Sequence, residues 1–450
     1  MTEDAISRYA ARAVPRYTSY PTAPHFQPGL PERVYRDWLS ALDPGEPVSL
    51  YLHVPFCNQM CWYCGCNMKL ASRYGPVHDY LETLLAEIDL VADALPGRMQ
   101  VSHLHWGGGT PTALSTEDLT RAMERVWQHF DRGVDASLAI EADPRTLTDE
   151  MVGAIGGLGF TRASFGVQEF DPKVQAAINR IQPPEMVADR VAALRDAGVA
   201  GMNFDLIYGL PHQTVATLLA TIEACRPMRP DRIALFGYAH VPWMAKNQRM
   251  IPEDALPDGA ERKAQANAAA AALASAGYDT IGLDHFALPS DPMARAARDG
   301  TLRRNFQGYT TDTARALIGL GATSIGRNPG GFVQNIAETG AWARTVSAGH
   351  LPIAKGVALT DDDRLRGRVI EALMCTGTAD TAALGAEFGQ PPDWCTAELE
   401  EMGEFARNGL VARDGGTVRL TEAGRPLMRV VAAAFDAYLG ASEARHSVAV

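Results

Sequence analysis

The chain has 450 residues, of which 46% are hydrophobic and 21% charged, a composition typical of a globular protein with one large and one smaller domain. Its formal net charge is −12, from 41 Lys and Arg against 53 Asp and Glu. Nucleic-acid and anionic-membrane partners are bound by clustered Lys and Arg, so this charge argues against both, although a local basic pocket can still bind a small anionic substrate.

The N-terminal residues predict an extended arm over 1–35. The chain begins Met1-Thr2-Glu3-Asp4, without the basic region and apolar stretch of a secretory signal. The most apolar run, 268–276, is alanine-rich and too short to span a bilayer, so we expect a cytoplasmic protein. Residues 1–35 are rich in Pro, Tyr and Arg, and Pro15 and Pro21 bias the residues before them away from helix.

From about residue 48, apolar runs alternate with helical patterns such as Val77–Ala94 and Pro184–Ala197. Strands are predicted at Val48–Val54, Val101–Trp106, Ser137–Ala142, Arg162–Val167, Met202–Tyr208 and Arg232–Tyr238. Alternation at this spacing predicts an α/β fold with a parallel sheet, and the number of units suggests a complete or partial (β/α) TIM-type barrel.

Polar and glycine residues follow these predicted strands, where a barrel gathers its chemistry. They are Cys57 after the first strand, Gly107-Gly108-Gly109 after the second, Glu141 near the end of the third, Gln168 after the fourth and Asp205 within the fifth. This agreement between the strand pattern and the placement of reactive residues supports the barrel.

A different pattern begins at about residue 357. Thr360 precedes three Asp residues and is predicted to cap a helix, and a hairpin is predicted over 409–420 with its turn at Gly415-Gly416. Helices followed by a hairpin resemble a winged helix, but residues 361–450 carry nine Lys or Arg against fifteen Asp or Glu, so a lid or scaffold is favoured over DNA binding. We expect an arm over 1–35, a barrel over 36–300, a connecting region over 301–356 and a mainly helical C-terminal domain over 357–450.

Four of the seven cysteines fall within ten residues of one another: Cys57, Cys61, Cys64 and Cys66. The odd total argues against a disulfide framework, and the scattered Cys225, Cys375 and Cys395 are interpreted as small buried hydrophobic residues. Clustered thiolates suit an iron–sulfur cluster, a zinc ion or a redox pair. Zinc sites usually take two ligand pairs from separate turns, and a redox pair leaves Cys57 and Cys66 unexplained, so an iron–sulfur cluster is favoured. Three thiolate ligands would leave one iron open for a chelating ligand.

The spacing Cys57-x-x-x-Cys61-x-x-Cys64, after a first barrel strand, resembles the signature of the radical S-adenosylmethionine superfamily. Within the superfamily, several stretches resemble the oxygen-independent coproporphyrinogen III oxidases: residues 15–22, 51–57, 64–67, 105–112, 205–211, 284–287 and 304–311. The resemblance covers nearly the whole chain and implies a partial barrel of the radical S-adenosylmethionine kind.

The resemblance also implies roles for individual residues. Cys57, Cys61 and Cys64 would hold a four-iron four-sulfur cluster, with Cys66 close by but not a ligand, and the candidate catalytic residues are Cys66, Tyr51 and His53. A first S-adenosylmethionine would contact Tyr51, Gly108, Glu141 and Ile325. A second would contact Tyr63, Gly109, Thr110, Gln168, Arg180, Asp205 and Ala239.

The implied reaction is oxidative decarboxylation of two propionate side chains of coproporphyrinogen III to vinyl groups, giving protoporphyrinogen IX in haem or related tetrapyrrole synthesis without oxygen. The implied partner is a reduced flavodoxin- or ferredoxin-type electron donor, and the chain is expected to be a monomer. Because the substrate carries four carboxylates, Arg16, Arg303 and Arg304 are candidate substrate ligands.

Two alternatives belong to the same superfamily. Haem chaperones are similar in the barrel but usually lack the cysteine at Cys66 and the arm around Arg16, both of which are present here. A radical enzyme that acts on a tetrapyrrole by methyl transfer or ring opening is the second alternative, and the match over 304–311 counts against it.

Overall fold

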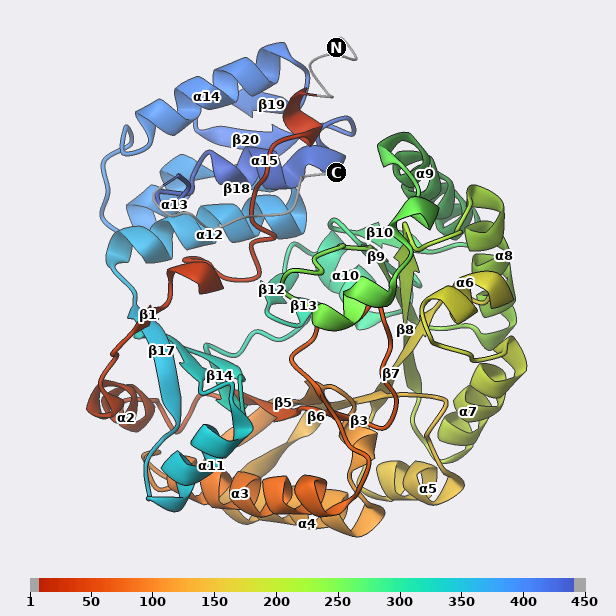
Figure 1. Ribbon diagram of the computed structural model, residues 1–450. Helices are drawn as coiled ribbons and strands as arrows, with labels where there is room; N and C mark the ends of the chain where they lie inside the picture. Colours follow the sequence, from red (N-terminus) through yellow and green to blue (C-terminus); the bar gives the residue numbers. More distant parts are fainter. Residues whose placement is uncertain (1–7, 441–450) are drawn as a thin grey trace. The chain divides into compact units, whose positions relative to one another are not determined.

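The computed structural model describes residues 8–440, so residues 1–7, which include the predicted start Met1-Thr2-Glu3-Asp4, and residues 441–450 lie outside the described residues (Figure 1). By contact the described residues form two compact units: unit 1 holds 8–26, 279–313 and 357–440, and unit 2 holds 27–278 and 314–356. The predicted connecting region, 301–356, contributes to both units. The predicted domain boundaries at 35, 300 and 356 remain predictions.

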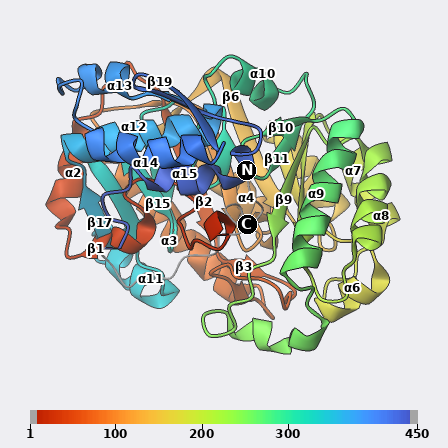
Figure 2. The same cartoon turned by 90° about the horizontal axis from the view of Figure 1, so that it is seen from above.

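Unit 2 is built on a mostly parallel sheet that curves, with helices on its outer side (Figures 1 and 2). β14, β2, β5, β6, β7, β8 and β9 pair in that order and all in parallel. The order of its strands is β1 (Gln27–Pro28), β17 (Ile353–Ala358), β16 (Gly331–Asn335), β15 (Ile325–Asn328), β14 (Ala316–Leu320), β2 (Val48–Val54), β5 (Gln100–Gly108), β6 (Asp131–Ala142), β7 (Arg162–Gln168), β8 (Gly201–Tyr208) and β9 (Arg232–Gly237). The predicted α/β fold with a parallel sheet is therefore confirmed.

The six predicted strands all form, and most of their bounds differ from the prediction by one or two residues. The strand predicted at Ser137–Ala142 is longer, because Asp131 and Arg132 pair with Gln100 and Val101 of β5. This extension is charged and lacks the apolar pattern of a buried strand, so pairing with β5 rather than local composition determines it.

Most helices of unit 2 begin at polar caps, although α2, α3 and α7 do not. Ser115 accepts a hydrogen bond from Asp118 N at the start of α4, and Thr214 forms a capping box at the start of α8. The helices are α2 (Glu32–Ser40), α3 (Gly75–Ala92), α4 (Thr116–His129), α5 (Asp149–Gly157), α6 (Pro172–Ala177), α7 (Pro184–Asp196), α8 (Val215–Cys225), α9 (Gly259–Ser275) and α11 (Thr339–Ser347). No helix within residues 8–440 is long and apolar enough to cross a membrane.

Unit 1 packs helices against a three-stranded antiparallel sheet, in the order β18 (Thr378–Asp380), β20 (Thr417–Leu420) and β19 (Val411–Asp414). Thr360 caps α12 (Asp361–Thr376) as predicted, and the predicted hairpin turns at Gly415-Gly416. The remaining elements are β10 (Asp279–Ile281), β11 (His285–Ala287), α10 (Pro292–Arg298), β12 (Arg303–Asn305), β13 (Gly308–Thr310), α13 (Thr381–Glu387), α14 (Thr396–Arg407) and α15 (Met428–Ala433).

Residues 8–26 of the predicted arm contribute to the core of unit 1, whereas residues 27–35 belong to unit 2 and include β1 and the start of α2. Tyr9, Val14, Tyr17 and Tyr20 are buried in one cluster with residues of α12, α14 and α15. The hydroxyl of Tyr9 donates to Glu404 at 2.7 Å, and that of Tyr17 donates to Asp436 at 3.0 Å. Burial of four large side chains of this kind stabilises the unit by several kcal/mol, about 1.5–3 kcal/mol for each.

A buried carboxyl group joins three elements of unit 2. Glu87 of α3 accepts hydrogen bonds from Gly321 N at 2.8 Å, from Trp342 Nε1 at 3.0 Å and from Asn335 Nδ2 at 2.6 Å. Trp342 also stacks on Tyr80, with ring centroids 4.4 Å apart. Burial raises the pKa of Glu87 to about 7 even though the three donors favour the ionised form.

We predict that Glu87 makes unit 2 less stable as the pH rises. Below the ordinary pKa of 4.5 the carboxyl is protonated in both states; between 4.5 and about 7 only the folded state keeps the proton. The free energy of unfolding therefore falls across this window, by at most ~1.4 kcal/mol per pH unit. Urea unfolding of the wild type and of Glu87→Gln, from about pH 5 to about pH 7.5, gives the free energy of unfolding of each, and the wild-type value minus the variant value is compared across the pH range. That difference should decrease with pH, and a constant or rising difference would contradict the prediction.

Candidate active site

The cysteine loop follows β2 and β3 (Phe56–Cys57) and is held by side chains from two other segments. The amide of Asn247 donates to three loop carbonyls and that of Gln248 to a fourth: Cys61 O at 3.1 Å, Trp62 O at 3.2 Å, Cys64 O at 2.8 Å and Tyr63 O at 2.8 Å. Asn179 Nδ2 donates to Met60 O at 2.7 Å. These bonds give the carbonyls of an irregular loop the partners that a helix or sheet would otherwise supply.

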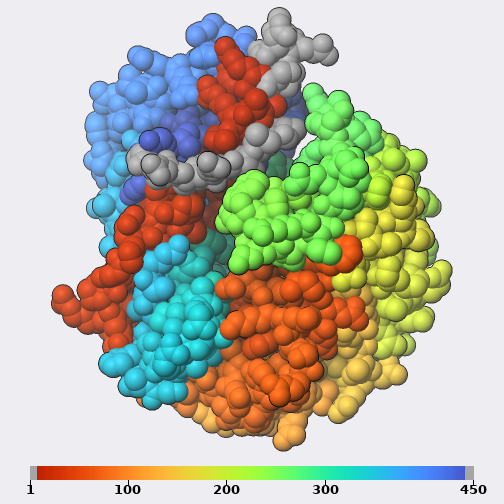
Figure 3. All heavy atoms as spheres, viewed as in Figure 1, coloured from red at the N-terminus to blue at the C-terminus, as the bar shows by residue number. Residues whose placement is uncertain are grey.

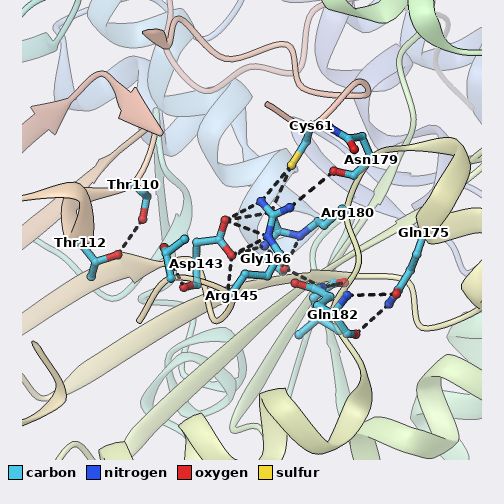
Figure 4. A network of polar contacts seen from close by, with 12 residues as sticks. Cys61, Thr110, Thr112, Asp143, Arg145, Gly166, Gln175, Asn179, Arg180 and Gln182 are labelled. Atoms are coloured by element: carbon cyan, nitrogen blue, oxygen red, sulfur yellow. Dashed lines mark hydrogen bonds and ion pairs between the residues drawn. The ribbon is translucent and has the colours of Figure 1, made fainter. Parts of the chain in front are cut away.

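Two buried guanidinium groups lie beside the sulfur of Cys61 (Figure 4). Arg145 Nη2 is 3.3 Å and Arg180 Nη1 is 3.4 Å from Cys61 Sγ. Both arginines also contact Asp143, at 2.6 Å and 3.4 Å. Burial opposes ionisation of Asp143, but the charges of Arg180 and Arg145 outweigh it and lower its pKa. Two positive charges and one negative charge leave a net positive charge beside the Cys61 sulfur.

The other thiols influence one another. Cys66 N donates to Cys64 Sγ at 3.4 Å, and the hydrogen bond from the Cys66 side chain lowers the pKa of Cys64 to about 7. Burial, together with the charges of Cys64 and Cys61, raises the pKa of Cys57 to about 12. Further cationic charge is therefore needed before all three thiols can ionise together, as a bound metal group would provide.

The donor set fits a cluster of several metal ions. Within residues 8–440, no three His, Cys, Asp or Glu side chains are arranged to hold a single metal ion. The ligands of an iron–sulfur cluster each bind a different iron, so they need not converge on one point. Three thiols on one loop, with guanidinium groups beside one of them, meet the requirements of such a cluster.

Tyr51 and His53 of β2 lie beside His105 and Glu141, on the next two strands. Tyr51 Oη is 2.9 Å from His53 Nδ1, and the Tyr51 ring stacks on that of His105. His105 Nε2 is 3.1 Å from Glu141 Oε1. Burial raises the pKa of Tyr51 well above its ordinary value, with a contribution from Glu141, and burial lowers that of His53. Both side chains are therefore uncharged at neutral pH.

Glycines at the end of β5 bring the backbone close to His53 and Glu141. Gly108 has φ of +122° and donates from its N–H to Glu141 Oε2 at 3.2 Å. A Cβ at Gly109 would meet Phe56 O at 2.5 Å, so only glycine fits there. Ile325 lies against Gly319, which pairs with Tyr51 across β14 and β2. The structure thus brings together Tyr51, Gly108 and Glu141, while Ile325 lies two strands from Tyr51.

The residues predicted for a second S-adenosylmethionine centre on β7 to β9. Gly166 pairs with Asp205, and Arg180 Nη2 donates to Gly166 O at 2.5 Å. Gln168 has φ of +64°, and its Oε1 is buried without a hydrogen-bond partner among the described residues. The carbonyls of Tyr63 and Ala239 share the amide of Gln248, and Thr110 N donates to Phe56 O at 2.8 Å.

In unit 1, the predicted substrate arginines differ in their contacts. Arg303 pairs with Glu371 at 3.5 Å, whereas Arg304 is buried, with its guanidinium 4.3 Å from the centre of the Tyr309 ring. Arg304 Nε and Nη1 have no hydrogen-bond partner in residues 8–440.

Arg429 of α15 forms a group with Arg16 and Arg304, whose charges act on it. Burial lowers the pKa of Arg429 to about 10, and the charges of Arg16 and Arg304 add to this effect. Asp284 is the nearby carboxylate, and it is already bonded to His285 at 2.7 Å. The group therefore has an excess of positive charge, and Nε and Nη1 of Arg304 are the buried donors without a partner among residues 8–440.

Sequence reasoning missed Asp143, Arg145 and Arg429. Asp143 and Arg145 follow Glu141 at the end of a predicted strand, so the rule that located Glu141 could also have found them. Arg429 lies on a helix more than a hundred residues beyond Arg304, and no local pattern connects the two.

Comparisons with known proteins identify the family of the chain. The model of the Radical SAM superfamily matches residues 51–225, and that of the HemN C-terminal domain matches 359–427. An oxygen-independent coproporphyrinogen III oxidase of Bradyrhizobium diazoefficiens is 50% identical over 450 residues, covering 100% of both chains. One from Pseudomonas aeruginosa is 40% identical over 443 residues, covering 97% of this chain and 95% of that one. The solved structure of coproporphyrinogen III oxidase (HemN) from Escherichia coli, described as a radical SAM enzyme, superimposes with a TM-score of 0.91 at 35% identity, covering 95% of this chain and 100% of that one.

We predict that iron binding depends on Cys57, Cys61 and Cys64. Changing any of them to Ala should remove the broad absorbance near about 400 nm and lower iron well below the roughly four atoms per chain of the wild type, because one corner of the cluster loses its thiolate. Cys225→Ala is the matched control, since Cys225 is buried on α8, away from the loop, and it should keep its iron. Stoichiometric zinc without iron in anaerobically purified protein would contradict the prediction.

Proposed function

The chain belongs to the oxygen-independent coproporphyrinogen III oxidases of the radical S-adenosylmethionine superfamily, and from this we propose that it converts two propionate side chains of coproporphyrinogen III to vinyl groups, giving protoporphyrinogen IX. The main observation behind the proposal is the loop of three thiols beside Arg145 and Arg180. The coproporphyrinogen III oxidase of Bradyrhizobium diazoefficiens matches the chain over its full length. Membership of the superfamily implies a four-iron four-sulfur cluster and S-adenosylmethionine.

Cys57, Cys61 and Cys64 would hold the cluster, and the positive charges beside Cys61 would offset its thiolate. When bound, the cluster and S-adenosylmethionine would supply the electron and the radical needed to remove one hydrogen atom from a propionate, and the electron left when carbon dioxide departs would pass to a separate electron acceptor. The chain supplies binding, orientation and exclusion of water. Tyr51 would remain protonated beside the neutral ring of His53 and donate a hydrogen bond, with Cys66 next to the reacting group.

We propose two S-adenosylmethionine molecules per chain. Tyr51, Gly108, Glu141 and Ile325 form one group around β2, where Glu141 can accept from an ammonium or hydroxyl group. The second group contains Tyr63, Gly109, Thr110, Gln168, Arg180, Asp205 and Ala239. Support for the second molecule comes from the buried and unpartnered Gln168 Oε1, which can accept a hydrogen bond from a ligand.

The proposed setting is the cytoplasm, where the chain would act as a monomer and take electrons from a reduced flavodoxin- or ferredoxin-type protein. The names of the relatives do not favour a haem chaperone or a tetrapyrrole methyl-transfer or ring-opening enzyme. Cys66 and Arg16, which the chaperones usually lack, are both present.

The direct test is anaerobic reconstitution with iron and sulfide, followed by incubation with coproporphyrinogen III, S-adenosylmethionine and dithionite. We expect protoporphyrinogen IX, carbon dioxide, 5′-deoxyadenosine and methionine. A reconstituted cluster that cleaves S-adenosylmethionine but never releases carbon dioxide from coproporphyrinogen would refute the proposed substrate.

The same assay separates Cys66 from the cluster ligands. Cys66 is only two residues from Cys64, and its N–H already contacts that sulfur. Cys66→Ser should keep the iron and the absorbance of the wild type and lose turnover. Loss of iron in this variant would make Cys66 a fourth ligand and leave no open iron.

We predict that Arg304 binds a propionate carboxylate of the substrate, with Arg16 contributing charge. Arg304→Gln should lower kcat/KM for coproporphyrinogen about tenfold or more, mainly through KM, since a hydrogen bond to a charged group contributes about 1.5–3 kcal/mol. Iron content and S-adenosylmethionine binding should not change. Arg303→Gln is the matched control on the same strand, because Arg303 already pairs with Glu371. Equal kinetic effects of the two changes would count against this assignment.

A further inference from the structure

Exposed apolar side chains are concentrated around the cysteine loop. Eight large hydrophobic residues are exposed within residues 8–440, and six of them lie in three short segments: 57–76, 172–184 and 239–252. Trp243 and Met244 are 64% and 78% exposed. The other four are Leu70, Tyr74, Ile181 and Met250. Such clustering marks an interaction site more often than chance exposure does.

The same three segments form and hold the cysteine loop. Segment 57–76 contains the four cysteines, and segment 172–184 contributes Asn179 to Met60 O. Segment 239–252 contributes Asn247 and Gln248 to the carbonyls of 61–64. In Figure 3 the green surface around residue 245 meets the orange surface that follows the loop. We call the exposed side chains of these three segments the loop face.

The loop face is positively charged on an acidic protein. The three segments contain no Asp or Glu, although the whole chain has a net charge of −12. Arg73, Lys173, Lys246 and Arg249 are exposed, and no hydrogen bond or ion pair engages their side chains within the described residues. Of the carboxylates that border the segments, Asp171 caps α6 and Glu253 lies 3.1 Å from His240, whereas Glu185 and Asp254 are exposed.

We propose that the loop face docks a small acidic electron-carrying protein. The inference rests on the proposed function, which requires one electron to reach the cluster for each S-adenosylmethionine that is cleaved. The donor would lose one electron and the cluster would gain it, so the step balances without a further reagent. An apolar centre surrounded by cations is complementary to an acidic partner, and docking here brings that partner to the loop that holds the cluster.

Charge reversal on the loop face tests the inference. In Lys246→Glu/Arg249→Glu, the Kd for oxidised flavodoxin and the KM for reduced flavodoxin should both rise about tenfold or more at low salt, because complementary charge becomes repulsion. The rate with dithionite, a small reductant that needs no docking, should stay within about twofold of the wild type. Iron content is measured on every sample. Trp243→Ser/Met244→Ser should weaken flavodoxin binding without changing its dependence on salt.

The matched control is Arg33→Glu/Lys263→Glu, which changes the net charge equally at exposed positions outside the loop face. It should leave Kd and KM within about twofold of the wild type. Equal effects of the two charge reversals, or no effect of either, would overturn the inference. The inference would also be overturned if the wild type were a dimer and Trp243→Ser/Met244→Ser dissociated that dimer without changing flavodoxin binding. If the wild type makes no protoporphyrinogen with dithionite, the proposed function is refuted. The docking inference is then still tested by comparing the Kd of flavodoxin for the two charge-reversed variants.

Discussion

Three thiolates on one short loop repel one another, and the protein around the loop offsets that repulsion. Arg145 and Arg180 lie within 3.4 Å of Cys61 Sγ, while Asp143 holds both guanidinium groups in place. The amides of Asn247 and Gln248 fix the loop backbone, so the thiols keep their positions before a metal group binds. Even with this arrangement, burial and the neighbouring thiols raise the pKa of Cys57 to about 12, so its ionisation needs the further positive charge of a bound metal group.

The parallel sheet places the other reactive groups beside that loop. β2, β5 and β6 are neighbours that run in the same direction, so Tyr51, Gly108 and Glu141 meet at one edge although 90 residues of chain separate the first from the last. The same geometry gathers Gln168 and Asp205 on β7 and β8. A radical needs a shielded site with fixed distances, and a rigid sheet edge provides both.

Local patterns determine much of this structure and were therefore visible in the sequence. Val48–Val54 forms β2 with its predicted bounds, Thr360 caps α12, and Gly415-Gly416 turn the hairpin, because each depends on residues close in the chain. The pairing of Arg145 with Cys61 and the grouping of Arg429 with Arg304 join distant residues, so no local pattern reveals them. The burial of Tyr9 and Tyr17 was hidden for the same reason: an irregular segment has no hydrophobic period to show which face is buried.

With three thiols as its ligands, the proposed cluster would have one iron without a protein ligand, and that iron would be open to S-adenosylmethionine. Mössbauer spectroscopy of protein reconstituted with ⁵⁷Fe, recorded before and after S-adenosylmethionine is added, measures this property. One iron in about four should change its isomer shift while the others keep theirs, because only the open iron gains new ligands. Identical spectra before and after addition, with S-adenosylmethionine shown to be bound, would contradict an open iron at this loop.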